Sequence, residues 1–164
     1  MSCRVVAIYP GTFDPFTLGH EDIVHRSVQL FGHLTVAVAA GHHKKTMFSL
    51  QERMEMAHDA FLDDPRVKVA SVAGLMRDFV LTCGATVMVR GVRAMSDFDY
   101  EYQLAGMNRC LMPQVETVFL TPSDPYQYIS STFVREIVLL GGDVTQLVSV
   151  GVHDRIKQKL SAWG

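Results

Sequence analysis

The chain has 164 residues, 48% of them hydrophobic and 20% charged, with a formal net charge of −2 at pH 7. This length predicts one domain spanning residues 1–164, and the near-neutral charge excludes a broad basic face for gripping nucleic acid. No apolar run could span a bilayer and no signal-peptide pattern is present, so we expect a cytoplasmic protein that binds no membrane. The three cysteines have no CxxC spacing, which favours reduced thiols.

The first quarter of the chain alternates short apolar runs with an amphipathic one. Arg4–Ile8 predicts a buried strand, Glu21–Phe31 a helix and Leu34–Ala40 a second strand. Between the first strand and the helix lies Tyr9–His20, which is rich in proline, glycine and threonine. This segment could bind an anion through backbone N–H groups, a helix N-terminus and an imidazole, or it could be an ordinary connection in which His20 caps the helix.

The rest of the chain continues the alternation and predicts the fold class. After a polar loop over Gly41–Phe48, the predicted elements are a helix capped by Ser49 and ending near Leu62, a strand at Val67–Val72, a helix at Leu75–Cys83, a strand at Thr86–Arg90, a helix at Asp97–Leu111, a strand at Val115–Leu120 and helices at Ser131–Leu140 and Val152–Leu160. Apolar strands alternating with helices predict an α/β fold, with a doubly wound, parallel, five-stranded, Rossmann-like sheet.

Polar side chains gather where these strands end. In a doubly wound sheet, ligands bind beyond the carboxyl ends of the strands, so loops from several strands should meet at one edge. The residues that follow the strand ends are Thr12, His20, His42, His43, Lys44, Lys45, Arg90, Arg93, Tyr126, Ser130, Ser131, Thr132 and Arg135. This convergence of cations and hydroxyls predicts a site for a polyanion, most simply a phosphate.

The individual signals have alternative interpretations. Lys44 and Lys45 are typical of a solvated loop. Arg90 directly follows the apolar residues 87–89 at the end of a strand, and it therefore needs a partner such as a phosphate. Ser130–Thr132 could simply cap a helix, or could form a triphosphate cradle together with Arg135. Since the sequence has no GxGxxG or GxxxxGK[ST] motif, phosphate binding beside a helix-start histidine suggests direct nucleotidyl transfer.

Two motifs carry a family resemblance. Thr17–His20 resembles the [H/T]xGH signature of the nucleotidyltransferase superfamily, and Ile129–Arg135 resembles its ISSTxxR signature. Within that superfamily the chain resembles the phosphopantetheine adenylyltransferase family from Val5 to about Asp143. The segments that carry this finer resemblance are Tyr9–Pro15, Lys44–Lys45, Arg90–Arg93, Asp97–Glu101 and Met107–Arg109.

The resemblance implies a reaction and roles for individual residues. The 4′-phosphate of phosphopantetheine would attack the α-phosphorus of ATP in line, giving dephospho-coenzyme A and pyrophosphate in coenzyme A biosynthesis. The implied catalytic residues are His20, Thr12, Lys44 and Arg93. The implied phosphopantetheine-binding residues are Thr12, Lys44, Met76, Arg90 and Asn108. The implied ATP-binding residues are Thr12, Phe13, His20, Gly91, Val92, Arg93, Glu101, Tyr126, Gln127, Tyr128, Ile129, Ser130, Ser131 and Thr132.

The resemblance also implies Mg²⁺ held mainly by phosphate oxygens, with no protein metal site, and assembly as a homohexamer.

This sequence departs from the family pattern at Gly41–His43, where an Asn/Ser-Pro turn is more usual, and at Val150, where proline is common. Three alternatives stay open: a nicotinamide mononucleotide adenylyltransferase, a cytidylyltransferase and a non-catalytic nucleotide-binding sensor.

Overall fold

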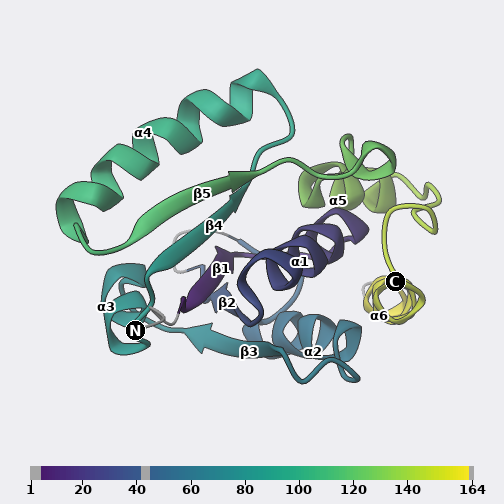
Figure 1. Ribbon diagram of the computed structural model, residues 1–164. Helices are drawn as coiled ribbons and strands as arrows, with labels where there is room; N and C mark the ends of the chain where they lie inside the picture. The colour runs from purple at the N-terminus through teal and green to yellow at the C-terminus, as the bar shows by residue number, and fades with distance from the viewer. Residues whose placement is uncertain (1–4, 42–44, 163–164) are drawn as a thin grey trace.

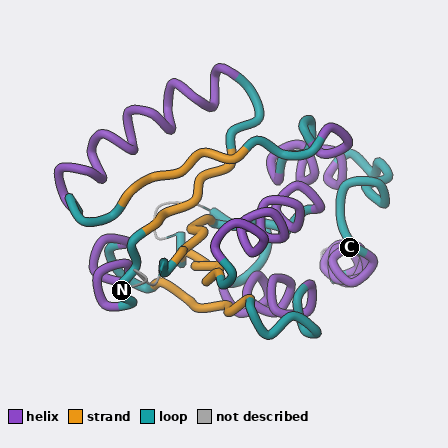
Figure 2. Tube along the Cα trace, viewed as in Figure 1, coloured by secondary structure: helices purple, strands orange, loops and turns teal. Residues whose placement is uncertain are grey.

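Five parallel strands form the centre of the computed structural model, which describes residues 5–41 and 45–162. The strand order is β3-β2-β1-β4-β5. Figure 2 shows the strands lying next to one another as a layer with helices around it. The strands are β1 (Ala7–Gly11), β2 (Leu34–Ala39), β3 (Val67–Val72), β4 (Val87–Gly91) and β5 (Glu116–Leu120).

Six α-helices and one short 3₁₀ helix connect and flank the strands within the described residues. Figure 1 shows α4 lying along β5, away from the other helices, and α6 at the C-terminal end of the chain. The helices are α1 (Leu18–Phe31), α2 (Leu50–Ala60), α3 (Met76–Thr82), α4 (Met95–Leu111), η1 (Asp124–Tyr126), α5 (Ser131–Leu139) and α6 (Val150–Ser161).

The two faces of the sheet have separate cores, because side chains alternate along a strand. Tyr9 and Val36 belong to a large cluster that includes residues of α1, α2, α5 and α6. Ile8 and Ala37 belong to a smaller cluster on the opposite face, which includes Val80 of α3. The doubly wound, parallel α/β fold expected from the sequence is therefore confirmed.

The first strand was predicted three residues too early. We expected Arg4–Ile8, whereas β1 runs from Ala7 to Gly11 and includes Pro10. β1 pairs with β4 only at Ala7 and Ile8, but continues beside β2 as far as Gly11. Beyond Ile8 the strand therefore has one neighbour, and a proline, which cannot donate to a ladder, is tolerated there.

The start of α1 also differs from the sequence expectation. The helix begins at Leu18, and Thr17 is its N-cap, with His20 completing a capping box. The sequence signal was missed because the usual third residue of this box is Glu or Gln, whereas here it is histidine. His20 thus lies inside the first turn of α1 rather than ahead of the helix.

The chain order fixes where a ligand can bind. From β1 the chain moves outward through β2 and β3, and then returns to the other side of β1 for β4 and β5. The strand order therefore reverses between β1 and β4, and a crevice forms at their carboxyl ends. Among the described residues no helix is both long and apolar enough to cross a membrane.

Candidate active site

A cavity of about 370 Å³ opens at the carboxyl ends of β1 and β4. It is bounded by the loop after β1, the first turn of α1, the segment after β2, the end of β4 and the first turn of α5. Twelve residues that the sequence predicted for the site line it: Thr12, Phe13, His20, Lys45, Arg90, Gly91, Arg93, Ile129, Ser130, Ser131, Thr132 and Arg135.

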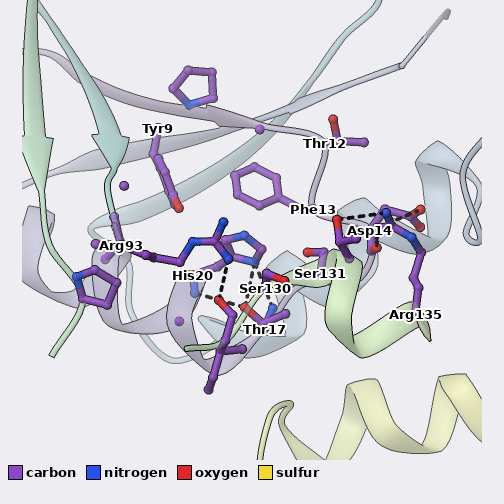
Figure 3. A pocket seen from close by; sticks show the side chains of 18 of the residues that line it. Tyr9, Thr12, Phe13, Asp14, Thr17, His20, Arg93, Ser130, Ser131 and Arg135 are labelled. Carbon is purple, nitrogen blue, oxygen red and sulfur yellow. Dashed lines mark hydrogen bonds and ion pairs between the residues drawn. The ribbon is translucent and has the colours of Figure 1, made fainter. Parts of the chain in front are cut away.

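Four cationic side chains give the cavity its charge. Lys45, Arg90, Arg93 and Arg135 line it, and among the described residues Asp14 is the one carboxylate in the lining. Figure 3 shows Arg93 on one side, Asp14 and Arg135 on the other, and the His20 ring between them. An excess of positive charge in a recessed site attracts and orients a polyphosphate.

The orientation and protonation of His20 are fixed by its own helix. The backbone N–H of Thr17 donates to Nδ1 of His20 at 3.0 Å, and the Thr17 hydroxyl lies 3.1 Å from the same nitrogen. Because Nδ1 accepts a hydrogen bond, the proton of the neutral ring is on Nε2. Burial and the nearby Arg93 charge lower the pKa of His20 to about 3. The site therefore contains a neutral imidazole with an N–H donor at neutral pH.

The Phe13 ring packs closely against the backbone that follows β1 and restricts the residues that fit there. Phe13 has φ of 53°, in the left-handed region that non-glycine residues rarely adopt. A Cβ on Gly11 would lie 2.7 Å from this ring, so only glycine fits there without a shift. The ring packs edge-on against His20, with centroids 5.0 Å apart. Gly11 and Phe13 thus form one wall of the His20 pocket.

Arg90 already has a carboxylate partner. Its Nε and Nη2 donate to the two oxygens of Glu101, each at 2.7 Å, and its Nη1 donates to the Pro10 carbonyl at 3.1 Å. Although burial works against it, the Glu101 carboxylate raises the pKa of Arg90. The sequence interpretation assigned Arg90 and Glu101 to different substrates. In the structure they are one ion pair at the end of β4.

Arg93 is held from two directions. Its Nε donates to Asp97 at 3.0 Å, and its Nη1 donates to the Ile129 carbonyl at 3.1 Å. Ser130 caps α5 by accepting the Phe133 N–H. Helix capping and a role in the phosphate site are therefore compatible for Ser130, because this capping serine also lines the cavity.

Other predicted residues lie elsewhere. Met76 and Asn108 meet in a second, more open hollow of about 530 Å³ between α3 and α4. His42, His43 and Lys44, which were also expected at the strand ends, lie outside the described residues. The predicted residues absent from the lining of the first cavity are Val92, Glu101, Tyr126, Gln127 and Tyr128.

Several residues of the cavity escaped the sequence-based site assignment. Asp14, Thr17 and Thr46 line it without an assigned role. Lys45, which was expected at the strand ends, lines it as well, although the resemblance gave a role only to its neighbour Lys44. Asp14 belongs to the Tyr9–Pro15 segment that carries the family resemblance, but the resemblance implied no role for it. Its burial, which is the signal of importance, is visible only in the folded chain.

The fold and the site are those of a nucleotidyltransferase. Residues 8–137 match the family model described as cytidylyltransferase-like. A protein named phosphopantetheine adenylyltransferase from Acidovorax sp. (strain JS42) is 64% identical over 157 residues, covering 96% of this chain and 95% of that protein. One with the same name from Ralstonia pickettii (strain 12J) is 56% identical over 155 residues, covering 94% and 93%. The chain belongs to the phosphopantetheine adenylyltransferase family, whose members are nucleotidyltransferase enzymes.

Solved structures agree on the fold. A bifunctional NMN adenylyltransferase/ADP ribose pyrophosphatase from Francisella tularensis matches with a TM-score of 0.68 at 13% identity, covering 89% of this chain and 45% of that one. A lipopolysaccharide core biosynthesis protein from Thermoplasma volcanium GSS1 matches with a TM-score of 0.56 at 22% identity, covering 73% and 98%. At these identities the likeness concerns the fold alone.

Proposed function

We propose that this chain catalyses adenylyl transfer from ATP to 4′-phosphopantetheine. An oxygen of the acceptor phosphate forms a bond to the α-phosphorus of ATP, and the bond from that phosphorus to the bridging oxygen of pyrophosphate breaks. The products are dephospho-coenzyme A and pyrophosphate. The observation that carries the proposal is the cationic cavity at the switch point, with a neutral N–H donor of His20 between its walls.

His20 would stabilise the transition state rather than transfer a proton. The acceptor phosphate is already an anion, so the reaction requires no general base. A neutral Nε2–H held by Thr17 can donate to an oxygen of the α-phosphate as negative charge gathers there. Because the ring position is fixed before substrate binds, no reorganisation is needed at the moment of reaction.

The acceptor side would consist of Thr12, Lys44 and Arg90 around the reacting phosphate, and of Met76 with Asn108 along the pantetheine arm. The pairing of Met76 and Asn108 in one hollow supports this, since a long thin arm needs a second recess beyond the phosphate site. Thr12 would contact both substrates, and Lys44 and Arg93 would share the charge of the transferring phosphoryl group.

The ATP side would lie against β4 and α5. The first turn of α5 points N–H groups and hydroxyls toward the cavity, an arrangement that favours phosphate oxygens. The residues we propose for ATP, besides Thr12 and His20, are Phe13, Gly91, Val92, Arg93, Glu101, Tyr126, Gln127, Tyr128, Ile129, Ser130, Ser131 and Thr132.

A divalent metal, which we propose to be Mg²⁺, would be held mainly by phosphate oxygens and water. Within the described residues no group of three acidic, histidine or cysteine side chains could hold a metal. The Asp14 carboxylate already accepts the backbone N–H groups of Met47 and Phe48. When bound, the metal would neutralise phosphate charge.

A pyrophosphate-release assay tests the proposal. The purified chain is incubated with ATP and either 4′-phosphopantetheine or nicotinamide mononucleotide. We expect pyrophosphate and dephospho-coenzyme A with the first acceptor, and resynthesis of ATP when both products are supplied. Turnover with the mononucleotide alone would make this a different adenylyltransferase. ATP binding without turnover of any acceptor would indicate a sensor.

The assembly remains a proposal as well. Phosphopantetheine adenylyltransferases are expected to form homohexamers, and α4 exposes Met95, Tyr100, Tyr102, Met107 and Leu111 in the single chain. Exposed apolar side chains gathered on one helix are typical of a surface covered by another copy. Measuring the mass in solution tests it.

A further inference from the structure

A buried arginine lies behind the candidate active site. Arg53 of α2 is 1% exposed and does not line the cavity. Its guanidinium donates to four backbone carbonyls: Thr12 at 2.7 Å, Ala39 at 2.7 Å, Ala40 at 3.1 Å and Phe48 at 3.2 Å. These carbonyls belong to the loop after β1, the end of β2 and the segment that leads into α2.

The interactions of Arg53 differ from those of the other arginines in the site. Arg90 and Arg93 pair with carboxylates, whereas Arg53 forms no ion pair among the described residues. A charge taken out of water is costly unless charge-assisted hydrogen bonds replace its hydration. The planar fork of arginine spreads five N–H donors over a rigid plane and can bind carbonyls of separate segments, whereas the ammonium of lysine offers three donors at a single point. Arg53 is thus suited to holding separate backbone segments in one arrangement.

A buried carboxylate, that of Asp14, joins the same two backbone segments by accepting hydrogen bonds where Arg53 donates them. Asp14, 3% exposed, lies in the loop after β1 and accepts the N–H groups of Met47 at 2.8 Å and Phe48 at 2.9 Å. Arg53 therefore binds carbonyls of two segments, while Asp14 of one segment binds amides of the other. Arg135 donates to the Asp14 carbonyl and extends the network to α5.

We infer that Arg53 and Asp14 are positioning residues for the transfer reaction. Together they fix the loop that carries Thr12 against the segment that carries Lys45 and Thr46, both of which line the cavity. The inference rests on the proposed function, in which these two segments flank the incoming phosphate. A displacement of one segment by a fraction of an ångström would misalign the attacking oxygen without removing any group that binds ATP.

The test uses Arg53→Lys, with Arg155→Lys as the matched control. Arg155 of α6 also joins two parts of the chain, through Glu55 and Asp59, but lies away from the cavity. For Arg53→Lys we expect kcat to fall about 10- to 100-fold, with the Kd for ATP changed less than about threefold. For Arg155→Lys we expect kcat within about twofold of wild type. Equal loss of kcat in both variants, or unchanged kcat in Arg53→Lys, would overturn the inference.

A second measurement is independent of activity. Asp14→Asn keeps the shape but turns one acceptor oxygen into an N–H donor, so one of the two amides loses its partner. Amide hydrogen exchange at Met47 or Phe48 should accelerate in this variant and in Arg53→Lys, while exchange in β5 stays unchanged. Unchanged exchange at both amides would contradict the inference, even if Arg53→Lys failed to fold. Faster exchange in the variants, together with a wild-type chain that turns over no phosphopantetheine, would reject the proposed function instead.

Discussion

The two sides of the cavity are built by different physical means. On the side of β1 and β2, buried charges bind backbone groups: Arg53 binds four carbonyls and Asp14 binds two amides. On the side of β4, Arg90 and Arg93 pair with carboxylates and stay partly exposed, their side chains being 21% and 36% accessible. A hydrogen bond to a backbone group can be broken only if the main chain moves. An ion pair with a side-chain carboxylate can be broken by a change of rotamer.

This difference suggests a division of labour. The first side fixes a geometry, and the second holds cations that can exchange a carboxylate oxygen for a phosphate oxygen. His20 lies between the two sides. Its geometry is fixed like that of the first side, because the backbone N–H of Thr17, its N-cap residue, holds the ring. Substitutions on the side of β1 and β2, the fixed side, should therefore lower kcat. Substitutions of Arg90 or Arg93 on the side of β4, the exchangeable side, should mainly lower the affinity for substrate.

The largest effect is expected for His20→Gln. Glutamine is a normal third residue of a capping box, so this variant keeps an acceptor for the Thr17 N–H but loses the imidazole Nε2–H. We expect kcat to fall about 100- to 1,000-fold, with KM for both substrates changed less than about threefold. Steady-state kinetics measure both constants. As a control, His33→Gln at an exposed position outside the cavity should leave kcat unchanged. Because the glutamine amide also carries N–H donors, His20→Ala is measured beside it, and wild-type kcat in His20→Ala would exclude the proposed role.

The second prediction concerns pH. The pKa of His20 is lowered to about 3 in the folded chain, whereas an unfolded histidine titrates near pH 6.5. Between these values the unfolded state binds a proton that the folded state does not, so stability is lost as pH falls. The free energy of unfolding should decrease by a contribution approaching about 1.4 kcal/mol per pH unit below pH 6. Urea denaturation at pH 7 and pH 5 measures it, and His20→Gln should lack this contribution. Equal slopes in both proteins would contradict the shifted pKa.

The third prediction concerns the exchangeable side at Arg90. Arg90→Ala should raise KM for phosphopantetheine roughly 10- to 50-fold and change KM for ATP little, because its guanidinium is proposed to bind the acceptor phosphate. It also leaves the buried carboxylate of Glu101 without its partner, so stability should fall by about 3 kcal/mol. Arg90→Ala combined with Glu101→Gln should recover part of that stability but not the KM. An effect confined to the KM for ATP would assign Arg90 to the other substrate.

The smallest effect is expected for Asp97→Asn. The Arg93–Asp97 pair is partly exposed and screened by solvent, so stability should fall by less than about 1 kcal/mol. Arg93 keeps its hydrogen bond to the Ile129 carbonyl. The KM for ATP should therefore change less than about threefold, whereas Arg93→Ala should raise it more. Thermal unfolding and initial rates check both. A kcat loss for Asp97→Asn as large as that of His20→Gln would contradict the division between the two sides.

Much of the site was predictable because it lies at strand ends. Hydrophobic periodicity placed the strands, and parallel strands bring their carboxyl ends to one edge. Thr12, His20, Arg93 and Ser130–Thr132 were therefore expected together and do line one cavity. The partner of Arg90 was not predictable, because Glu101 lies nearly two turns into α4 and contacts β4 only through tertiary packing.

By itself, the sequence determined the fold class, the switch point and the residue types that meet there, because these depend on periodicity and chain order. The tertiary structure alone decided which tautomer His20 adopts, that Phe13 must take a left-handed backbone beside Gly11, and that Arg53 and Asp14 are buried. The burial of Arg53 and Asp14 depends on contacts between segments far apart in the chain, whereas the His20 tautomer and the Phe13 backbone depend on local geometry that residue types alone do not reveal. An arginine in a capped amphipathic helix looks like a surface residue until the backbone carbonyls that surround it are in place.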